Sequence, residues 1–322
     1  MAKSHFMLTH ERAISFLKQN PALSLSVLEK EAQLPASTLS KALTGDRQLN
    51  PKHLAGLYPI LVKYGFKEFA NERAKVISVV NHKGGVGKTT TTLNLGKALV
   101  KLGYRVLLID MDSQGNLSQA LGHDNPEKQV VQALLKGEPL PVISIADHYD
   151  LAPSDLELAY ADLELVQAVG GVNQLKNVIA PIRSQYDYIF IDCPPALNIF
   201  TNSALVASTG CLVTLQPEAS ALKGVNNLFD RITQVRDRIN YELTIEGIIL
   251  TMVDARLKVH RDMIEYIKNT LSNFNIFTTV IRQNVALKES QISQQDIFEY
   301  APDSNGAKDY FKLAQELSGN KN

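Results

Sequence analysis

The sequence is poor in cysteine, with only Cys193 and Cys211 in a chain of 322 residues. These two do not have the spacing of a metal-ligand pair, and disulfides are rare in reducing compartments. A disulfide-stapled fold and a cysteine-based metal centre are therefore excluded. We expect both residues to be small buried apolar side chains, the usual state of a free cysteine.

Long apolar runs are also missing. None approaches the roughly 18 residues that a membrane helix needs, and the first residues, MAKSHFMLTHER, lack the apolar core of a signal peptide. The apolar content of 45% and charged content of 20% are typical of globular proteins. At about 100 to 200 residues per domain, the chain has room for two. We expect a cytoplasmic protein of two domains that does not bind membrane.

Net charge is likewise absent, but its distribution is uneven. Residues 1–74 carry ten Lys/Arg against six Asp/Glu, and the rest of the chain carries 23 against 27. The N-terminal part, with an excess of four positive charges, is thus the better candidate for binding an acidic polymer such as DNA.

Short helical patterns follow one another through the first 70 residues. They cover His10–Gln19, Ser26–Gln33, Ala36–Leu43 and Pro51–Tyr64. Ser26 with Glu29 three residues later has the pattern of a capping box. Pro35 and Gly45 mark the start and the end of the third helix. Residues 1–70 are therefore predicted to form a small all-α domain.

The pattern changes at Lys75, where apolar runs begin to alternate with helical stretches. The runs are KVISVV (75–80), YRVLLID (104–110), YDYIFID (186–192), CLVTLQ (211–216) and IEGIILTMVD (245–254). Strands that are apolar on both faces and separated by helices indicate a parallel sheet covered on two sides. Residues 75–322 are thus predicted to form a doubly wound, mostly parallel α/β domain. The segment Phe66–Ala74 connects the two domains, with residues 71–74 as the linker.

The stretch NHKGGVGKTTTT (81–92) is close to the phosphate-binding pattern G-x-x-x-x-G-K-[ST]. Counting back from Gly87, the first glycine of that pattern is replaced by His82, and an additional lysine, Lys83, follows it. A predicted strand precedes the loop and a helical pattern over 88–102 follows it, which is the context that the motif requires. The alternative is a glycine-rich turn without a ligand.

Each residue type in this loop has a chemical reason to be there. Gly84, Gly85 and Gly87 let the backbone turn its N–H groups onto phosphate oxygens. Lys88 places a charge on the β and γ phosphates, and Thr89 offers a hydroxyl to Mg²⁺. The loop therefore predicts a nucleoside triphosphate site.

Three aspartates follow two of the predicted strands. Asp110 and Asp112 end one of them, and residues two apart on a strand point the same way, so both carboxylates are expected on one side of the sheet's C-terminal edge. Asp192 ends another run at that edge, and an acid in this position normally holds Mg²⁺ through a water. This arrangement favours ATP hydrolysis over simple binding. The alternative for Asp112 is that it only caps the following helix.

Several blocks together resemble one family. KGGVGKTT (83–90) is similar to the deviant Walker A motif of the ParA/MinD ATPases, VLLIDMDSQGN (106–116) to their second motif, and FIDCPP (190–195) to their Walker B motif. LTMVDAR (250–256) and IRQNVALKES (281–290) resemble late ParA segments. The resemblance runs from about Lys75 to the end of the chain.

The resemblance implies an ATPase that acts as a homodimer. In the family the signature lysine, here Lys83, reaches across an ATP sandwich to the partner's nucleotide, and the second aspartate of the D-x-D, here Asp112, positions the attacking water. With Lys88 these are the expected catalytic residues. A cation supplied in trans neutralises transition-state charge and couples turnover to association.

ATP and Mg²⁺ are the cofactors that the resemblance implies. The expected nucleotide contacts are Lys83, Gly84, Gly85, Val86, Gly87, Lys88, Thr89, Thr90, Asp110, Asp192, Gln216 and Met252. Thr89 and Asp192 are expected to hold the metal, the aspartate through a water.

The stretch QLPASTLSKALTGDRQL (33–49) resembles the recognition half of a repressor-type helix-turn-helix. Leu39 and Leu43 would share the buried face of its helix. The side chains left for phosphates or base edges are Ser37, Thr38, Ser40 and Lys41. Two positions depart from the pattern, Gln33 at the usual turn glycine and Glu29 where a small residue commonly packs. A helical interaction domain that binds no DNA is the alternative.

A second, sequence-independent DNA surface belongs to the ATP dimer in this family. The basic candidates in this chain are Arg256, Lys258, His260, Arg261 and Lys288, and the alternative is a solvated helix start. Many members carry two arginines in a P-R-N-V-R loop where this sequence has Gln283 and Ala286. Binding to the nucleoid is thus expected to be weaker or to use other residues.

Other relatives are disfavoured by the residues. MinD-like proteins end in a basic amphipathic helix that binds membrane, whereas the apolar residues of AKDYFKLAQELSGNKN (307–322) are expected to pack on the domain. The nitrogenase iron protein needs cluster cysteines in surroundings that neither cysteine here has.

The resemblance therefore implies a plasmid-type partition ATPase that is cytoplasmic and associated with the nucleoid. A ParB-type centromere-binding partner would stimulate its hydrolysis, and the chain would also repress its own operon at operator DNA. Two alternatives remain at the level of sequence: a nucleotide-gated transcriptional repressor, and a positioner of protein cargo.

Overall fold

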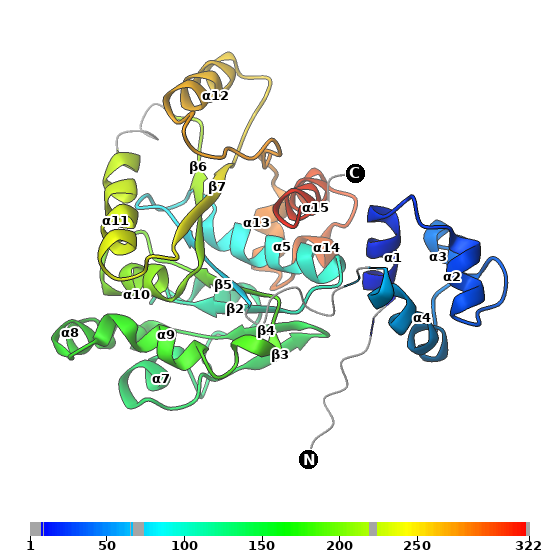
Figure 1. Cartoon of the computed structure of the whole chain (residues 1–322). Helices are drawn as coiled ribbons and strands as arrows, with labels where there is room; N and C mark the ends of the chain where they lie inside the picture. The colour runs from blue at the N-terminus through cyan, green and yellow to red at the C-terminus, as the bar shows by residue number, and fades with distance from the viewer. Residues whose placement is uncertain (1–7, 9, 65, 67–73, 219–223, 320–322) are drawn as a thin grey trace.

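The computed structural model describes residues 8, 10–64, 66, 74–218 and 224–319. Four helices occupy the N-terminal part: α1 (His10–Gln19), α2 (Leu25–Glu31), α3 (Thr38–Thr44) and α4 (Pro51–Lys63). These four helices lie together (Figure 1). They enclose an apolar core of their own, in which Leu28, Leu39, Leu57 and Leu61 are almost completely buried. The helices lie within two residues of the positions predicted for them. Most of the predicted linker, 71–73, lies outside the described residues.

The capping box predicted for Ser26 and Glu29 is wrong. Helix α2 begins at Leu25 after Ser24, so Glu29 lies in the interior of the helix, on its buried face. Its carboxylate instead accepts hydrogen bonds from the backbone N–H groups of Ser37 (3.0 Å) and Leu39 (2.7 Å). A buried acid here joins α2 to the first turn of α3.

A seven-stranded sheet forms the centre of the larger part, in the order β3-β4-β2-β5-β1-β6-β7. Its strands are β1 (Lys75–Val80), β2 (Val106–Asp110), β3 (Ile143–Ala146), β4 (Tyr149–Ala152), β5 (Tyr188–Asp192), β6 (Gly210–Leu215) and β7 (Thr244–Leu250). All neighbouring pairs are parallel except β3 with β4. The predicted mostly parallel sheet is confirmed. The β3–β4 hairpin was not predicted, because its two short strands, ISIA and YDLA, contain no continuous apolar run.

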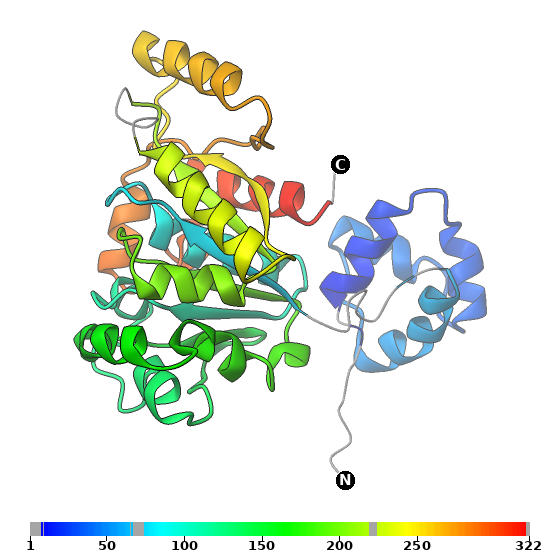
Figure 2. The ribbon, with the colours of Figure 1, turned by 60° about the vertical axis from the view of Figure 1, so that its left-hand side comes forward.

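Helices cover both faces of this sheet. They are α5 (Lys88–Lys101), α6 (Asn116–Ala120), α7 (Val130–Lys136), α8 (Ala161–Gln167), α9 (Gln174–Ile179), α10 (Ile199–Ala207), α11 (Val225–Arg238), α12 (Lys258–Thr270), α13 (Ala286–Ile292), α14 (Ile297–Tyr300) and α15 (Asn305–Leu317), with 3₁₀ turns η1 (Leu156–Tyr160), η2 (Gly171–Asn173) and η3 (Arg183–Gln185). Helices α5 and α15 contribute to the core on one face, and α7 to α11 to the core on the other (Figures 1 and 2).

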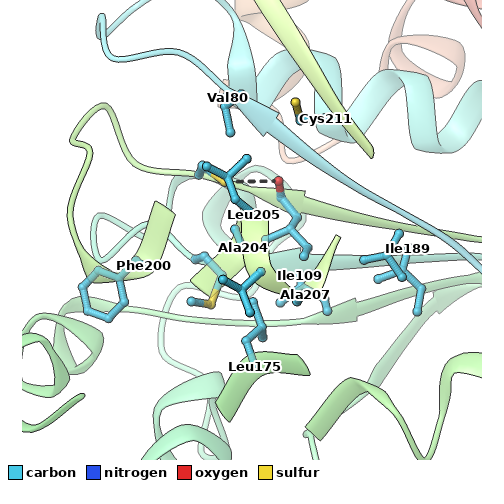
Figure 3. Close-up of a cluster of buried hydrophobic side chains, with 14 of the residues drawn as sticks. Val80, Ile109, Leu175, Ile189, Phe200, Ala204, Leu205, Ala207 and Cys211 are labelled. Atoms are coloured by element: carbon cyan, nitrogen blue, oxygen red, sulfur yellow. Dashed lines mark hydrogen bonds between the residues drawn. The ribbon is translucent and has the colours of Figure 1, made fainter. Parts of the chain in front are cut away.

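Alternation along the strands builds the two cores. In β1, Val76 and Val80 point to the face of α7 to α11, whereas Ile77 and Val79 point to the face of α5. Figure 3 shows part of the first of these cores, including Cys211. Both cysteines are free and buried, as expected.

The C-terminal helix α15 packs on α5, and its Tyr310 hydroxyl lies 3.2 Å from the hydroxyl of Thr91. Ala307, Leu313 and Ala314 are buried in the same core. The prediction that the apolar residues of this segment pack on the domain is therefore confirmed. Among the described helices, none has the length and apolarity that a membrane span requires.

Candidate nucleotide-binding site

The loop between β1 and α5 is held in place by side chains from neighbouring strands. Asn81, at the end of β1, donates from Nδ2 to the carbonyl of Thr214 in β6 (2.5 Å) and accepts from the N–H of Lys83 (2.9 Å). Gly85 and Gly87 have φ angles of +73° and +83°, which only glycine adopts without strain. The sequence thus places glycine at the turns that direct the backbone N–H groups of the loop.

Val86, expected to contact nucleotide, is almost completely buried under the loop. Its carbonyl accepts a hydrogen bond from the hydroxyl of Thr251, just after β7 (2.9 Å). The side chain therefore supports the loop from below, and only its backbone belongs to the phosphate cradle.

Lys88 opens α5 and is mostly buried. Its ammonium donates to the carbonyl of Lys83 (3.1 Å), so it lies across the inside of the loop. Burial lowers the pKa of Lys88, and the nearby carboxylates of Asp192 and Asp112 oppose that shift. A partly desolvated cation at a helix N-terminus gains from an anionic ligand.

Thr89 and Asp192 meet directly below the loop. The hydroxyl of Thr89 donates to Oδ2 of Asp192 (2.7 Å), and the hydroxyl of Thr92 lies 3.3 Å from Oδ1. Burial raises the pKa of Asp192, and the neighbouring carboxyl of Asp110 raises it further. A hydroxyl and a buried carboxylate are hard oxygen ligands, and a divalent cation would offset the charge of the acid, so this donor set fits Mg²⁺.

The expectation for Asp110 is wrong. Its carboxylate is completely buried rather than facing the nucleotide cavity. One oxygen accepts from the N–H of Asp112 (3.1 Å), and the other accepts from the N–H (3.0 Å) and the hydroxyl (2.8 Å) of Ser118. The strand β2 ends at Asp110, and the two carboxylates have different surroundings, that of Asp110 in the interior and that of Asp112 at the cavity. Asp110 holds the loop that carries Asp112.

Asp112 lines the cavity with its side chain largely buried. It accepts a hydrogen bond from the N–H of Gln114 (3.0 Å), and its carbonyl accepts one from the hydroxyl of Ser154 (2.9 Å). Helix α6 begins at Asn116, with Gly115 as its N-cap. Asp112 therefore does not cap this helix, which removes the alternative reading of that residue.

The cavity at this edge of the sheet has a volume of about 910 Å³. The phosphate loop and the start of α5 form its floor, with Gly84, Gly85, Gly87, Lys88, Thr89 and Thr90. Asp112 and α6 form a second wall, and α13 forms a third. Gln216 and Met252, expected to contact the nucleotide, also line it. A volume of this size accommodates a nucleoside triphosphate.

Lys83 lies in different surroundings from Lys88. Its ammonium forms an ion pair with Glu218 at 2.7 Å, and 37% of its side-chain surface is exposed. It does not belong to the lining of the cavity. The two lysines of the loop therefore face different environments, one inside the site and one toward solvent.

The predicted DNA residues after β7 do lie together. Arg256 forms a two-pronged ion pair with Asp254 (2.9 and 2.7 Å), and Arg261 donates to the carbonyls of Ala255 and Arg256. His260 instead accepts from the N–H of Asp254 through Nδ1. Lys258 is exposed at the start of α12. The cluster exists, but two of its cations are engaged with the turn itself.

Lys288 does not join that cluster. It lies on α13 and lines the nucleotide cavity. Because α13 packs against α6, this exposed lysine lies at the nucleotide cavity, and its assignment to the DNA surface stays a prediction.

In the N-terminal part, Ser37, Ser40 and Lys41 are exposed on α3 and just before it. Thr38 is completely buried and donates to the carbonyl of Pro35 (2.7 Å), so its assignment to a DNA contact is wrong. Gln33 and Ser37 have positive φ angles of 55° and 63°. Gln33 thus adopts the conformation that a turn glycine would have.

Sequence reasoning missed several residues of the site. Asn81, Gln114 and Gln291 carry amide groups that anchor the loop or line the cavity. Asn81 adjoins the loop, which is a usable signal. Gln291 lies 201 positions from its partner Thr90, and the residues around Gln291 contain no pattern that predicts this contact.

Comparisons with known proteins agree with this geometry. A family model described as an AAA domain matches residues 74–245, more than half of the chain. The sporulation initiation inhibitor protein Soj of Bacillus subtilis strain 168 is 39% identical over 252 residues, which cover 76% of this chain and 99% of that protein. The chromosome partitioning protein ParA of Myxococcus xanthus strain DK1622 is 35% identical over 248 residues, covering 76% and 87%. The chain belongs to the ParA-type family of P-loop ATPases.

A solved structure resembles this ParA-type chain as well. The cobyrinic acid a,c-diamide synthase of Mycobacterium smegmatis with bound ADP and magnesium aligns with a TM-score of 0.68 and 30% identity, over 76% of this chain and 94% of that one. The family model begins at residue 74, one residue before β1. The part of the chain that the family model matches therefore begins after the four N-terminal helices.

Proposed function

We propose that this chain is a plasmid-type partition ATPase that binds Mg²⁺ and ATP, dimerises on ATP and binds DNA as the dimer. The observation that carries the proposal is the different placement of Lys88 and Lys83 in one phosphate loop. Lys88 is buried across the loop, whereas Lys83 lies outside the cavity and has 37% of its side-chain surface exposed. A lysine placed like Lys83 is suited to contact the nucleotide of a partner subunit rather than the nucleotide of its own subunit.

Within one subunit the chain's residues divide the work of hydrolysis. The loop glycines and Lys88 bind and orient the phosphates, and Thr89 with Asp192 holds Mg²⁺, which offsets the charge of the phosphates. Asp112, buried at the cavity wall and fixed by its bonds to Gln114 and Ser154, orients the attacking water. Lys83 of the partner subunit then stabilises the charge of the transition state. Hydrolysis removes the γ-phosphate that links the two subunits, and the dimer then separates.

DNA binding is assigned to two parts of the chain. Exposed Ser37, Ser40 and Lys41 on α3 suit an operator, in keeping with a helix-turn-helix that represses the chain's own operon. Lys258 with Arg256 and Arg261 suits phosphates of non-specific nucleoid DNA, and such contacts weaken steeply with salt. A ParB-type centromere-binding partner stimulates hydrolysis and frees the dimer from DNA. Family membership and the relative named chromosome partitioning protein ParA support this part of the proposal.

Replacing Asp112 tests the scheme. We expect D112A to bind ATP normally, because the loop glycines and Lys88 that contact the phosphates are unchanged. It should hydrolyse ATP very slowly and accumulate as a dimer, because the attacking water is no longer positioned. Size-exclusion chromatography with light scattering, with ATP and with ADP, measures this. The matched control is D124N, since Asp124 also lines the cavity but contacts Gln294 at its far rim. A D112A protein that stays monomeric in ATP contradicts the sandwich dimer.

The exposed face of α3 also favours a second candidate, a transcriptional repressor whose operator binding is gated by nucleotide. Plasmid loss separates the two. A partition ATPase with D112A loses its replicon even when the operon is expressed from a foreign promoter, whereas a repressor with D112A changes expression and leaves plasmid inheritance intact.

A further inference from the structure

One face of α13 forms a wall of the nucleotide cavity. Lys288, Gln291 and Ile292 are three and four residues apart, so they share a side of the helix, and all three line the cavity. The helix also carries Leu287 and Ser290, which are buried. This burial fixes which way the helix faces, and it turns Lys288 toward the site.

A direct bond attaches α13 to the phosphate loop. Nε2 of Gln291 donates to the hydroxyl of Thr90, at 3.0 Å. Thr90 is the residue after Thr89, whose hydroxyl is bonded to Asp192 at the metal end of the site. Lys288 lies one helical turn before Gln291, so its position is tied to the floor of the cavity rather than to an independent loop.

The geometry also indicates which phosphate is nearest. A smaller cavity of about 80 Å³ adjoins the large one, and Gly87, Thr90, Met252 and Lys288 line both. In a phosphate loop the lysine and the metal-binding hydroxyl mark the β and γ phosphates. Thr90 and Lys288 line the junction of the two cavities, whereas neither Lys88 nor Thr89 lines the smaller cavity. The junction therefore corresponds to the beginning of the phosphate chain, where the α-phosphate joins the nucleoside.

We propose that Lys288 is a nucleotide-binding residue whose ammonium contacts the α-phosphate of a bound nucleoside diphosphate or triphosphate. The side chain is exposed, and within the described part of the chain its ammonium makes no hydrogen bond or ion pair. Lysine is a mobile point charge that readily pairs with phosphate. The proposal rests on the proposed function only in that the cavity binds a nucleotide. It gives this lysine a role in binding ATP and ADP alike, instead of DNA.

Nucleotide affinities of K288M test the assignment. Because ATP and ADP share the α-phosphate, we expect K288M to weaken both by the same factor, about five- to tenfold, as for one ammonium contact that stays open to solvent. Competition with a fluorescent ADP analogue in Mg²⁺ gives both constants. K288R keeps most of the affinity, and K268M, which removes an exposed lysine of α12, changes neither constant. The deficit of K288M shrinks between 50 and 300 mM salt, because the lost contact is ionic.

Several outcomes overturn the assignment. A loss confined to ATP places the lysine on the γ-phosphate, and a K288R protein as weak as K288M shows a packing role instead of a charge. If the parent chain binds both nucleotides and K288M binds them equally well, the role of Lys288 in nucleotide binding is refuted while the proposed function stands. A fall in ATP-dependent DNA retention in that variant would assign the lysine to DNA instead. A parent chain that binds neither nucleotide refutes the proposed function itself.

Discussion

At the scale of single residues, surroundings separate two lysines that lie five positions apart. Lys88 is buried, donates to a backbone carbonyl and has its pKa lowered by burial. Lys83 is paired with Glu218, and both side chains are more than a third exposed. Exposed ion pairs typically contribute about 0 to 1 kcal/mol, so Glu218 does not prevent Lys83 from moving to another anion. The same amino acid is thus a buried side chain held by the loop in one position and a partly exposed, ion-paired side chain in the other.

Substituting the two lysines should give opposite patterns. We expect K83A to keep its affinity for ATP within about threefold but to lose turnover by a factor on the order of 10³, the lower range for a cation supplied in trans. K88A should lose nucleotide binding itself, because the buried ammonium is part of the phosphate cradle. Equilibrium nucleotide binding together with steady-state phosphate release distinguishes the two. Unchanged turnover in K83A would leave the signature lysine without a role.

At the scale of elements, one buried acid joins two helices of the N-terminal part. Glu29 in α2 accepts the N–H groups of Ser37 and Leu39, which belong to the start of α3. Helix α3 therefore receives its N-terminal cap from a side chain eight to ten positions earlier, not from Ser37. This contact explains why a carboxylate is present where a small residue commonly packs. The contact fixes the start of the helix on which Ser40 and Lys41 are exposed.

Removing that acid should loosen α3. In E29A two backbone N–H groups lose their acceptor, and a charged hydrogen bond contributes about 1.5 to 3 kcal/mol, so we expect local stability to fall by about 2 kcal/mol or more. E31A is the control, since Glu31 makes exposed contacts with Lys63 and with the hydroxyl of Tyr64 and accepts no backbone N–H of α3. Hydrogen exchange of peptides covering 24–45 measures the effect. Equal protection in E29A and E31A would mean that the carboxylate does not hold the helix.

At the scale of the whole molecule, the sheet brings two buried acids into register at its C-terminal edge. Asp110 of β2 is the register partner of Asp192 of β5, and both are completely buried. Burial raises the pKa of each, and for Asp192 the neighbouring Asp110 adds to the shift. The folded chain therefore holds protons that the unfolded chain has already released near pH 4. Bound Mg²⁺ would take the place of such a proton.

Stability without metal should consequently fall as pH rises. A raised folded-state pKa means that the native state binds more protons than the unfolded state, so the free energy of unfolding decreases from about pH 4 upward toward the raised pKa. We expect the melting temperature in EDTA to drop between pH 5.5 and pH 8, with a smaller drop in Mg²⁺ and ADP. Calorimetry measures both. D192N, which cannot ionise, should flatten the decline in EDTA, and an equally steep decline in D192N would contradict this origin.

Particular residues show where prediction from sequence succeeded. The phosphate loop, the strand before it and the helix after it appear where they were expected, because glycine spacing and apolar runs act over neighbouring residues. The five apolar strands were found for the same reason. Thr38 and Asp110 were misjudged, and the position of Lys288 at the cavity was not foreseen, because burial and orientation depend on segments far away in the chain.

The sequence by itself determined that this chain has a nucleotide loop of the ParA type, since local backbone geometry requires those glycines and the chemistry requires those lysines. The tertiary structure decided which side chains reach the cavity. Lys288 and Gln291 follow Thr90 by some two hundred residues in the sequence. They reach the phosphate loop because α13 packs against α6. Packing of a helix face is a property of the whole core, and no short pattern contains it.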